Sequence, residues 1–180
     1  MKQILLTIFI AATLLSSCSK EKSLAEDTNY HLTCNIDGVP TSFNVNSGAI
    51  ELNQGGFWVL GMGGISADSA NAPTLALGIY ATETGKKVPA GSYTDNGTTF
   101  QLLSTYSDVQ QQIDYSAGQD MYNQAIQAGF TIQNHLQIQV IELTDKIVRG
   151  TFSGDYFEDS ELDGTIKKIT NGDFYLLIQQ

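Results

Sequence analysis

Apolar and polar residues alternate along most of the chain from residue 30 onward. Leu32, Cys34 and Ile36 are each separated by one polar residue and are followed by Asp37-Gly38. A period of two places apolar side chains on one face of a β-strand, and Asp-Gly between two apolar runs is typical of a tight two-residue turn. The pattern therefore predicts a hairpin at the start of a β-rich domain.

The same alternation recurs in later segments, which are separated by stretches rich in Gly, Pro, Asn and Ser. Further strands are predicted at 57–62, 74–80, 98–104, 136–140 and 148–156. Residues 106–129 interrupt the rhythm, because they are rich in Tyr, Gln and Asp. We expect an irregular segment there, with one short helix near 119–128.

The end of the chain carries the clearest turn signal. Asn171-Gly172 stands between apolar runs, and Asn-Gly favours a type I′ turn because both central positions need φ > 0. We therefore predict a hairpin whose second strand starts at Phe174. Apolar residues on both faces of that strand, such as Leu176 and Leu177, indicate a central strand buried on both sides.

About nine short strands with turns between them indicate an all-β, mainly antiparallel fold, either a β-sandwich or, alternatively, a closed β-barrel. Residues 30–180 are numerous enough to bury a sizeable core as a single domain. We find no internal repeat and no sign of a second domain in this range.

The N-terminus has a different pattern. Lys2 precedes an apolar run, Ile4 to Leu15, that suits a signal peptide and is shorter than the roughly 20 residues of a membrane-spanning helix. The run ends in Leu15-Ser16-Ser17-Cys18, which resembles the lipobox of bacterial lipoproteins. The resemblance implies that residues 1–17 are removed and that Cys18 carries acyl chains such as palmitate, which anchor the protein in a membrane.

Residues 18–29 contain no aromatic residue and no apolar periodicity, so we expect a disordered tether between the anchor and the domain. Ser19 resembles the residue that permits sorting to the outer membrane in many Gram-negative lipoproteins. We therefore expect a location in the cell envelope, at the outer membrane, with the membrane face left open.

Charge and cysteine content limit the partners and the chemistry. The whole chain has a net charge of −10, and an acidic protein repels nucleic acid and anionic lipid headgroups. With Cys18 committed to lipid, only Cys34 is left, so no disulfide can form within the chain. Because Cys34 alternates with apolar residues, we interpret it as a buried hydrophobic residue.

Several short motifs occur together in a fixed order after the lipobox. They are Ile36-Asp37-Gly38, Gly91-Ser92-Tyr93, Gly150-Thr151-Phe152-Ser153 and Ile169-Thr170-Asn171-Gly172-Asp173-Phe174. In this order the chain resembles a group of small, uncharacterised β-rich lipoproteins of Gram-negative bacteria. The resemblance implies a shared fold and brings no activity with it.

One acidic segment imitates part of a calcium-binding loop. Asp159, Glu161 and Asp163 alternate before a glycine, as in the first half of an EF-hand loop. The closing position holds Thr170 instead of Glu, and no helices are predicted on either side. We therefore expect no cofactor, with a looser calcium site at these three acids as the alternative.

Catalytic motifs are absent from the sequence. Its two histidines, His31 and His135, lie far apart, and no nucleophile elbow or zinc-binding helix motif accompanies them. A glycine-rich run at residues 61–64 lacks the third glycine and the helix of a dinucleotide site. We therefore expect that the protein is not an enzyme, with a hydrolase of dispersed active site as the alternative.

Tyr106, Tyr115 and Tyr122 fall in the irregular segment among aspartates and glutamines. Aromatic faces beside amide and carboxylate groups suit stacking on sugar rings and hydrogen bonding to them. These tyrosines are candidate ligand-binding residues, or else they hold the segment on the core. We expect an envelope lipoprotein with a non-catalytic β-domain that binds protein or glycan, or one that serves only as a spacer.

Overall fold

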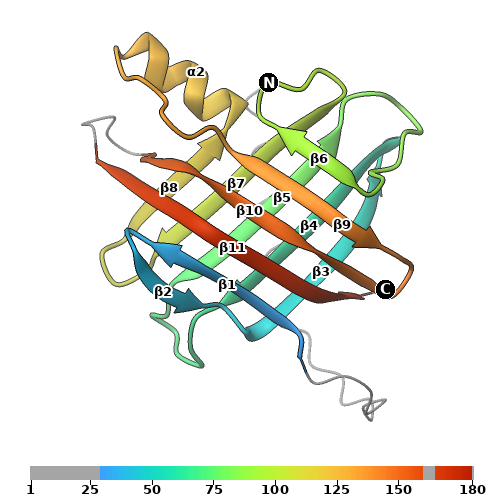
Figure 1. The fold of residues 1–180 in the computed structure, drawn as a ribbon, viewed down its shortest axis with the longest axis horizontal. Coiled ribbons are helices and arrows are strands. Elements are labelled where there is room, and N and C mark those ends of the chain that lie inside the picture. Colours follow the sequence, from blue (N-terminus) through green and yellow to red (C-terminus); the bar gives the residue numbers. More distant parts are fainter. Residues whose placement is uncertain (1–28, 160–164, 180) are drawn as a thin grey trace.

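A computed structural model describes residues 29–159 and 165–179 of the chain (Figure 1). The predicted signal peptide, Cys18 and most of the predicted tether lie outside these residues. The described part is mainly antiparallel β-structure with one short helix. The predicted all-β fold class is therefore confirmed.

The strands form two layers that face each other (Figure 1). The layer that we call the β11 layer has the order β2-β1-β11-β10-β9-β6. Its strands are β1 (His31–Ile36), β2 (Val39–Ser42), β6 (Gly91–Thr94), β9 (Gln137–Leu143), β10 (Ile147–Glu158) and β11 (Ile166–Gln179).

The second layer, which we call the β4 layer, has the order β3-β4-β5-β7-β8. Its strands are β3 (Val45–Gln54), β4 (Phe57–Ile65), β5 (Thr74–Ala81), β7 (Phe100–Asp108) and β8 (Ile113–Gly118).

Two short pairings join the layers at opposite corners. The end of β11 runs parallel to β3 at Ile178 and Gln179, and the end of β10 pairs with β8 at Phe157 and Glu158. The ladder of strands therefore returns on itself. The fold combines features of the two predicted architectures, the β-sandwich and the closed β-barrel. It is a sandwich with closed corners and not an ideal barrel.

The core lies between the layers and is built from the inward positions of both. The β11 layer contributes Leu32 and Phe174, and the β4 layer contributes Leu60 and Ile79, all of them 0–1 % exposed. Each such side chain stabilises the fold by roughly 1.5–3 kcal/mol. Cys34 is 3 % exposed among them, and burial raises the pKa of its thiol to about 12. Its predicted role as a buried hydrophobic residue is confirmed.

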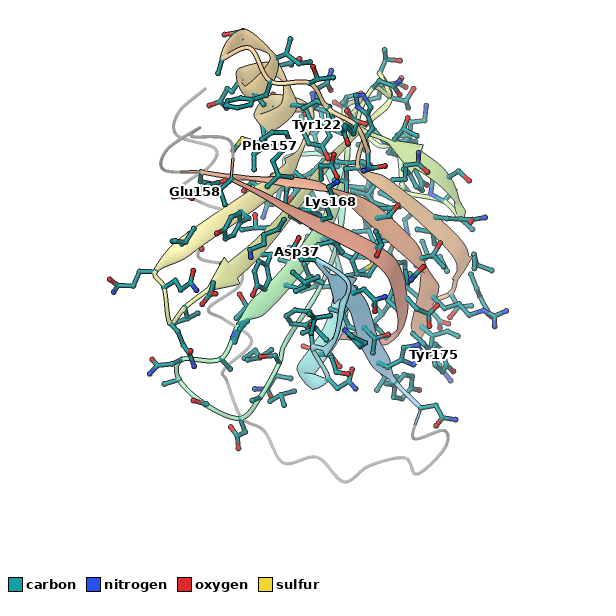
Figure 2. The ribbon with its side chains drawn as sticks, turned by 60° about the vertical axis from the view of Figure 1, so that its left-hand side comes forward. Asp37, Tyr122, Phe157, Glu158, Lys168 and Tyr175 are labelled. Atoms are coloured by element: carbon teal, nitrogen blue, oxygen red, sulfur yellow. The ribbon has the colours of Figure 1, made fainter. Side chains whose placement is uncertain are left out.

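The opening hairpin forms as predicted. Asp37 and Gly38 have φ angles of 51° and 83° and connect β1 to β2. The Asp37 carboxylate also accepts hydrogen bonds from the Lys168 backbone at 2.9 Å and from the Lys167 ammonium at 3.1 Å, and Figure 2 shows Asp37 beside Lys168. The turn is therefore tied to β11.

The hairpin predicted at Asn171-Gly172 does not exist, because β11 continues through both residues. Asn171 has a φ of 51°, and the pairing slips there by one residue against both β1 and β10. The Asn-Gly pair therefore forms a β-bulge in a long strand. Gly172 is needed for packing, since a Cβ there would lie 2.5 Å from the backbone oxygen of Phe152.

The prediction that the last strand is buried on both faces is also wrong. Phe174 and Leu176 are buried, but Leu177 is 44 % exposed on the opposite face. The strand is central for another reason, since it pairs with β1, β10 and β3.

The helix predicted near 119–128 is α2 (Gln119–Gln127), which lies at one end of the two layers (Figure 1). The rest of the segment predicted to be irregular contains the end of β7 and all of β8. In β8, Ile-Asp-Tyr-Ser-Ala-Gly, the alternate residues are Ile, Tyr and Ala, and only one of them is aliphatic with a long side chain. In the part of the chain that the structure describes, no helix is long and apolar enough to cross a membrane.

Candidate functional site

The three candidate tyrosines are core residues and not a surface platform. Tyr106 is 7 % exposed, and Tyr115 and Tyr122 are each 2 % exposed. Tyr106 and Tyr115 are opposite each other on β7 and β8 with ring centroids 6.0 Å apart. They occupy inward positions of paired strands, so that they cannot stack on a ligand from outside. The prediction of a ligand platform at these residues is wrong.

The candidate calcium loop lies mostly outside the described residues, since only Asp159 of its three acids is described. Burial raises the pKa of the Asp159 carboxyl, which accepts a hydrogen bond from the Ser116 hydroxyl at 2.9 Å. Among residues 29–159 and 165–179, no three acidic, histidine or cysteine side chains gather as a metal site. The strands β10 and β11 flank the loop, in place of the two helices of an EF-hand.

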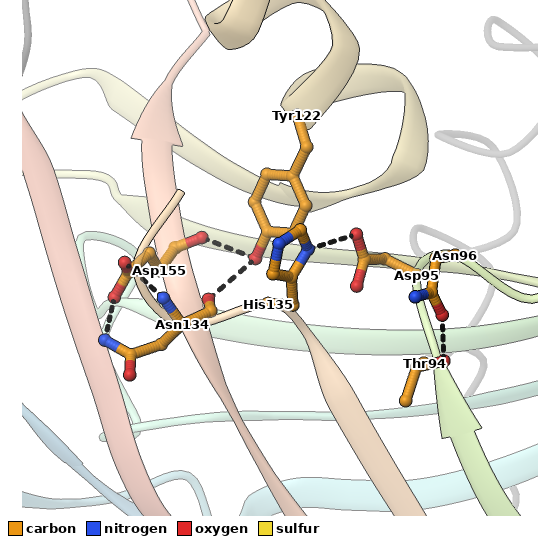
Figure 3. Close-up of polar contacts among 7 residues, drawn as sticks. All are labelled: Thr94, Asp95, Asn96, Tyr122, Asn134, His135 and Asp155. Carbon is orange, nitrogen blue, oxygen red and sulfur yellow. Dashed lines mark hydrogen bonds and ion pairs between the residues drawn. The ribbon is translucent and has the colours of Figure 1, made fainter. Parts of the chain in front are cut away.

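A polar cluster lies below α2 (Figure 3). The Tyr122 hydroxyl donates to the backbone oxygen of Asp155 at 2.8 Å. The Asp155 carboxylate, 2 % exposed, accepts two hydrogen bonds of 2.9 Å from the backbone and the side-chain amide of Asn134. These bonds connect three parts of the chain: α2, the segment that precedes β9, and the strand β10. We therefore interpret them as the attachment of the helix to the sandwich.

An aspartate–histidine pair extends this cluster. His135 Nδ1 donates to Asp95 Oδ2 at 2.8 Å, and the imidazole packs edge-on against Tyr122. Asp95 is 4 % exposed, and its second oxygen, Oδ1, has no hydrogen-bond partner among the described residues. An oriented imidazole is one part of a hydrolase site. Among the described residues, the hydrogen bond of the His135 side chain goes to Asp95, and none goes to a serine or cysteine.

The outer face of the β11 layer carries a straight row of polar residues. The strand register places one residue from each of six strands side by side, and none of the six is buried. The row, from β2 to β6, is Ser42, Thr33, Asp173, Thr151, Gln139 and Ser92. Because neighbouring strands lie about 4.8 Å apart, the row presents hydroxyl, amide and carboxylate groups at regular spacing.

Two hollows on this face meet at Asp173. The first, of about 450 Å³, extends over β6, β9 and β10 and includes Gln139 and Thr151 in its lining. The second, of about 400 Å³, is lined by His31, Arg149 and Tyr175 among others. Asp173 lines both. We call the two together the outer groove.

Thr94 and Asp173 in the first hollow are hydrogen-bonded within the protein, but most of its polar side chains are not. Within residues 29–159 and 165–179, no hydrogen bond is made by the side chains of five of its lining residues. They are Ser92, Gln137, Gln139, Thr151 and Ser153. Folding therefore does not use these donors and acceptors, which leaves them available to a ligand.

The second hollow contains an organised histidine. His31 Nε2 lies 2.5 Å from the Asp173 carboxylate, and its Nδ1 lies 2.6 Å from the Asn29 backbone oxygen. Both partners are acceptors, so only the doubly protonated imidazolium donates to both. Burial lowers the pKa of His31, but the hydrogen bonds to Asp173 and Asn29 and the charge of Asp173 together raise it above its ordinary value.

Aromatic rings border the same hollow. Tyr175 lies next to His31 in the strand register, and its ring centroid is 5.0 Å from that of Tyr30. Figure 2 shows Tyr175 at the opposite end of the layers from Tyr122. Tyr175 on β11 and Tyr30 before β1 are therefore two partly exposed tyrosines that lie together at this hollow.

Sequence reasoning missed the outer groove. The outward positions of each strand follow from the alternation, but their neighbours on other strands depend on a register that joins distant segments. The only local signal was the run of polar residues at alternate positions of 137–139 and 151–153.

Comparison of the chain with family models, curated proteins and solved structures finds no match. The fold and the groove by themselves define a class, an all-β sandwich domain with a polar groove across the outer face of one layer.

Proposed function

We propose that this protein is an envelope-anchored lipoprotein whose β-domain is a non-catalytic binding module, with the outer groove as its binding surface. The observation that carries the proposal is the set of polar side chains in the first hollow that make no hydrogen bond within the described chain. Polar groups that folding leaves free are the usual means of orienting a bound ligand. The motif ending in Cys18 supports the membrane anchor.

Chemical labelling in the native envelope tests the binding surface without assuming a ligand. Gln139→Cys places a thiol in the groove, and Gln101→Cys places one on the exposed outer face of β7 in the other layer. Cys34 should not react with the label, because it is buried and the pKa of its thiol is raised. We expect a maleimide to label Gln139→Cys at least several-fold more slowly in washed envelopes than in the purified protein, and Gln101→Cys equally in both. Equal labelling of Gln139→Cys in the two preparations would refute the proposal.

The anchor is tested separately with Cys18→Ala. Without the thiol no lipid can be attached, so we expect the variant to lose palmitate labelling and to leave the membrane fraction on mild washing. Normal palmitate labelling of this variant would show that Cys18 is not the lipidated residue.

A further inference from the structure

We infer that the ligand of the outer groove is a neutral, hydroxyl-rich glycan. This inference rests on the proposed function and adds the chemical class of the ligand. The groove offers mainly hydroxyl and amide groups, which both donate and accept hydrogen bonds. Sugar hydroxyls have the same double capacity, so one Gln139 amide or Thr151 hydroxyl can serve a sugar in either direction.

The charges of the groove favour a neutral ligand. Arg149 is paired with Glu142 at 2.8 Å, and the His31 imidazole is paired with Asp173 at 2.5 Å. These are the cationic residues that line the two hollows, and each already has a carboxylate partner. A polyanion would have to break these pairs and approach a chain of net charge −10.

The second hollow adds an aromatic surface to these polar groups. Tyr175 lines it, with Tyr30 against the ring at 5.0 Å. Ile141, 53 % exposed, lies in the same hollow. An aromatic face with polar groups beside it suits the apolar face of a sugar ring, whose edge carries hydroxyls. The groove is thus polar at the β6 end and aromatic near His31.

The shape of the groove favours an extended chain. The part of the row that lines the first hollow, Asp173, Thr151, Gln139 and Ser92, crosses four strands (Figure 1), and with strands about 4.8 Å apart it presents one polar side chain at each step. A protein partner would bury mainly aromatic, Met and apolar residues at the centre of its interface. The centre of this row is Asp173, Thr151 and Gln139, so the glycan is the better match.

The experiment uses the purified full chain in mild detergent. Electrophoresis through gels that contain a neutral polysaccharide (an α-glucan, a β-glucan or a mannan) should retard the protein in at least one gel. A gel that contains polygalacturonate, an anionic polysaccharide, should not retard it. Gln139→Ala and Tyr175→Ala should each weaken binding about tenfold, as expected for loss of one hydrogen bond or one stacking ring. Gln101→Ala is the matched control and should bind as the wild type does.

The labelling experiment in native envelopes tests for a glycan ligand that none of these gels contains. Envelopes that lack the protein are treated with periodate, which cleaves vicinal diols, or with protease. Each reagent is quenched before purified Gln139→Cys is added, because periodate also oxidises thiols and protease would cut the variant. Periodate-treated envelopes should then fail to protect Gln139→Cys, whereas protease-treated envelopes should still protect it. Protection that is lost with protease and survives periodate would mean a protein partner, which overturns the glycan inference and leaves the binding surface in place. Absence of protection in untreated envelopes would instead overturn the proposed function itself.

Discussion

The outer faces of the two layers differ although both layers follow the same alternation. On the β11 layer the register aligns six polar residues, from Ser42 to Ser92. On the β4 layer one row is Gly48, Gly63, Ala76, Thr105 and Ser116, and the next row is Ile50, Gly61, Gly78, Leu103 and Gly118. The row on the β11 layer carries a hydrogen-bonding side chain at every position, whereas the two rows on the β4 layer consist largely of small and apolar residues.

This difference shows which residues the fold needs for its core and which outward residues it does not need. The inward residues of both layers are mainly apolar, because they form one common core. The outward residues of the β4 layer largely cover their own strands; the ring of Tyr80, for example, lies within 2.9 Å of where a Cβ of Gly78 would be. The outward residues of the β11 layer do not cover it in this way, and hollows remain between them. This contrast is why we propose the β11 layer as the binding surface.

The largest expected effect distinguishes the buried tyrosines from the surface tyrosine. Tyr122→Ala should lower the free energy of unfolding by about 3–5 kcal/mol, as for other large buried aromatic residues. Tyr106→Ala and Tyr115→Ala should cost a similar amount. Tyr175→Ala, at a half-buried outer position, should cost clearly less. Urea denaturation measures all four, and a Tyr122→Ala variant as stable as Tyr175→Ala would contradict the placement of Tyr122 in the core.

A smaller effect is expected at the bulge in β11. Gly172→Ala should cost about 1–3 kcal/mol, because its Cβ would overlap Phe152. Asn171→Ala should cost only about 1 kcal/mol, the penalty of a left-handed backbone for alanine. The urea midpoints of the two variants measure these stability losses. Equal losses at the two positions would indicate a tight turn, in which both residues need positive φ, instead of a bulge limited by packing.

The smallest effect concerns His31, which belongs to the β11 layer alone. Its pKa is raised in the folded protein above the ordinary value of 6.5, so folding favours the protonated form. The stabilisation is therefore complete below pH 6.5 and is lost as pH rises through the raised pKa. The stability difference between wild type and His31→Gln should shrink from pH 5 to pH 9 in thermal melts. A difference that grows with pH would show that the imidazole is bound as the neutral form.

The elements with strong local signals could be predicted from the sequence, and those with weak signals could not. The hairpin at Asp37-Gly38 and the helix α2 were predicted because their signals are local. The strand β8 was missed because its alternation is short and rests on Ile113, Tyr115 and Ala117, in a segment rich in Tyr, Gln and Asp. Asn171-Gly172 was misinterpreted because a turn and a bulge both accept positive φ, and the pairing with β1 and β10 decides between them.

The proposed binding surface could not be predicted from the sequence for a related reason. His31 and Asp173 are 142 positions apart, and nothing local indicates that they pair. The tyrosines of the 106–129 segment were predicted to bind a ligand because they cluster in sequence. They are buried instead, since they lie on the inward faces of β7, β8 and α2. Residues that are close in sequence turned out to form part of the core. The residues of the outer groove are far apart in sequence and are brought together by the strand register.

The side-chain amide signals of two glutamines test the central claim most directly. Gln139 lies in the groove and Gln101 lies on the outer face of the β4 layer, and substitution of each assigns its signals in an NMR spectrum. During titration with fragments of the polysaccharide that retards the protein, we expect the Gln139 signals to shift in a saturable manner while those of Gln101 stay in place. A saturable shift of Gln101 with Gln139 unchanged would place the ligand on the other layer and contradict the account.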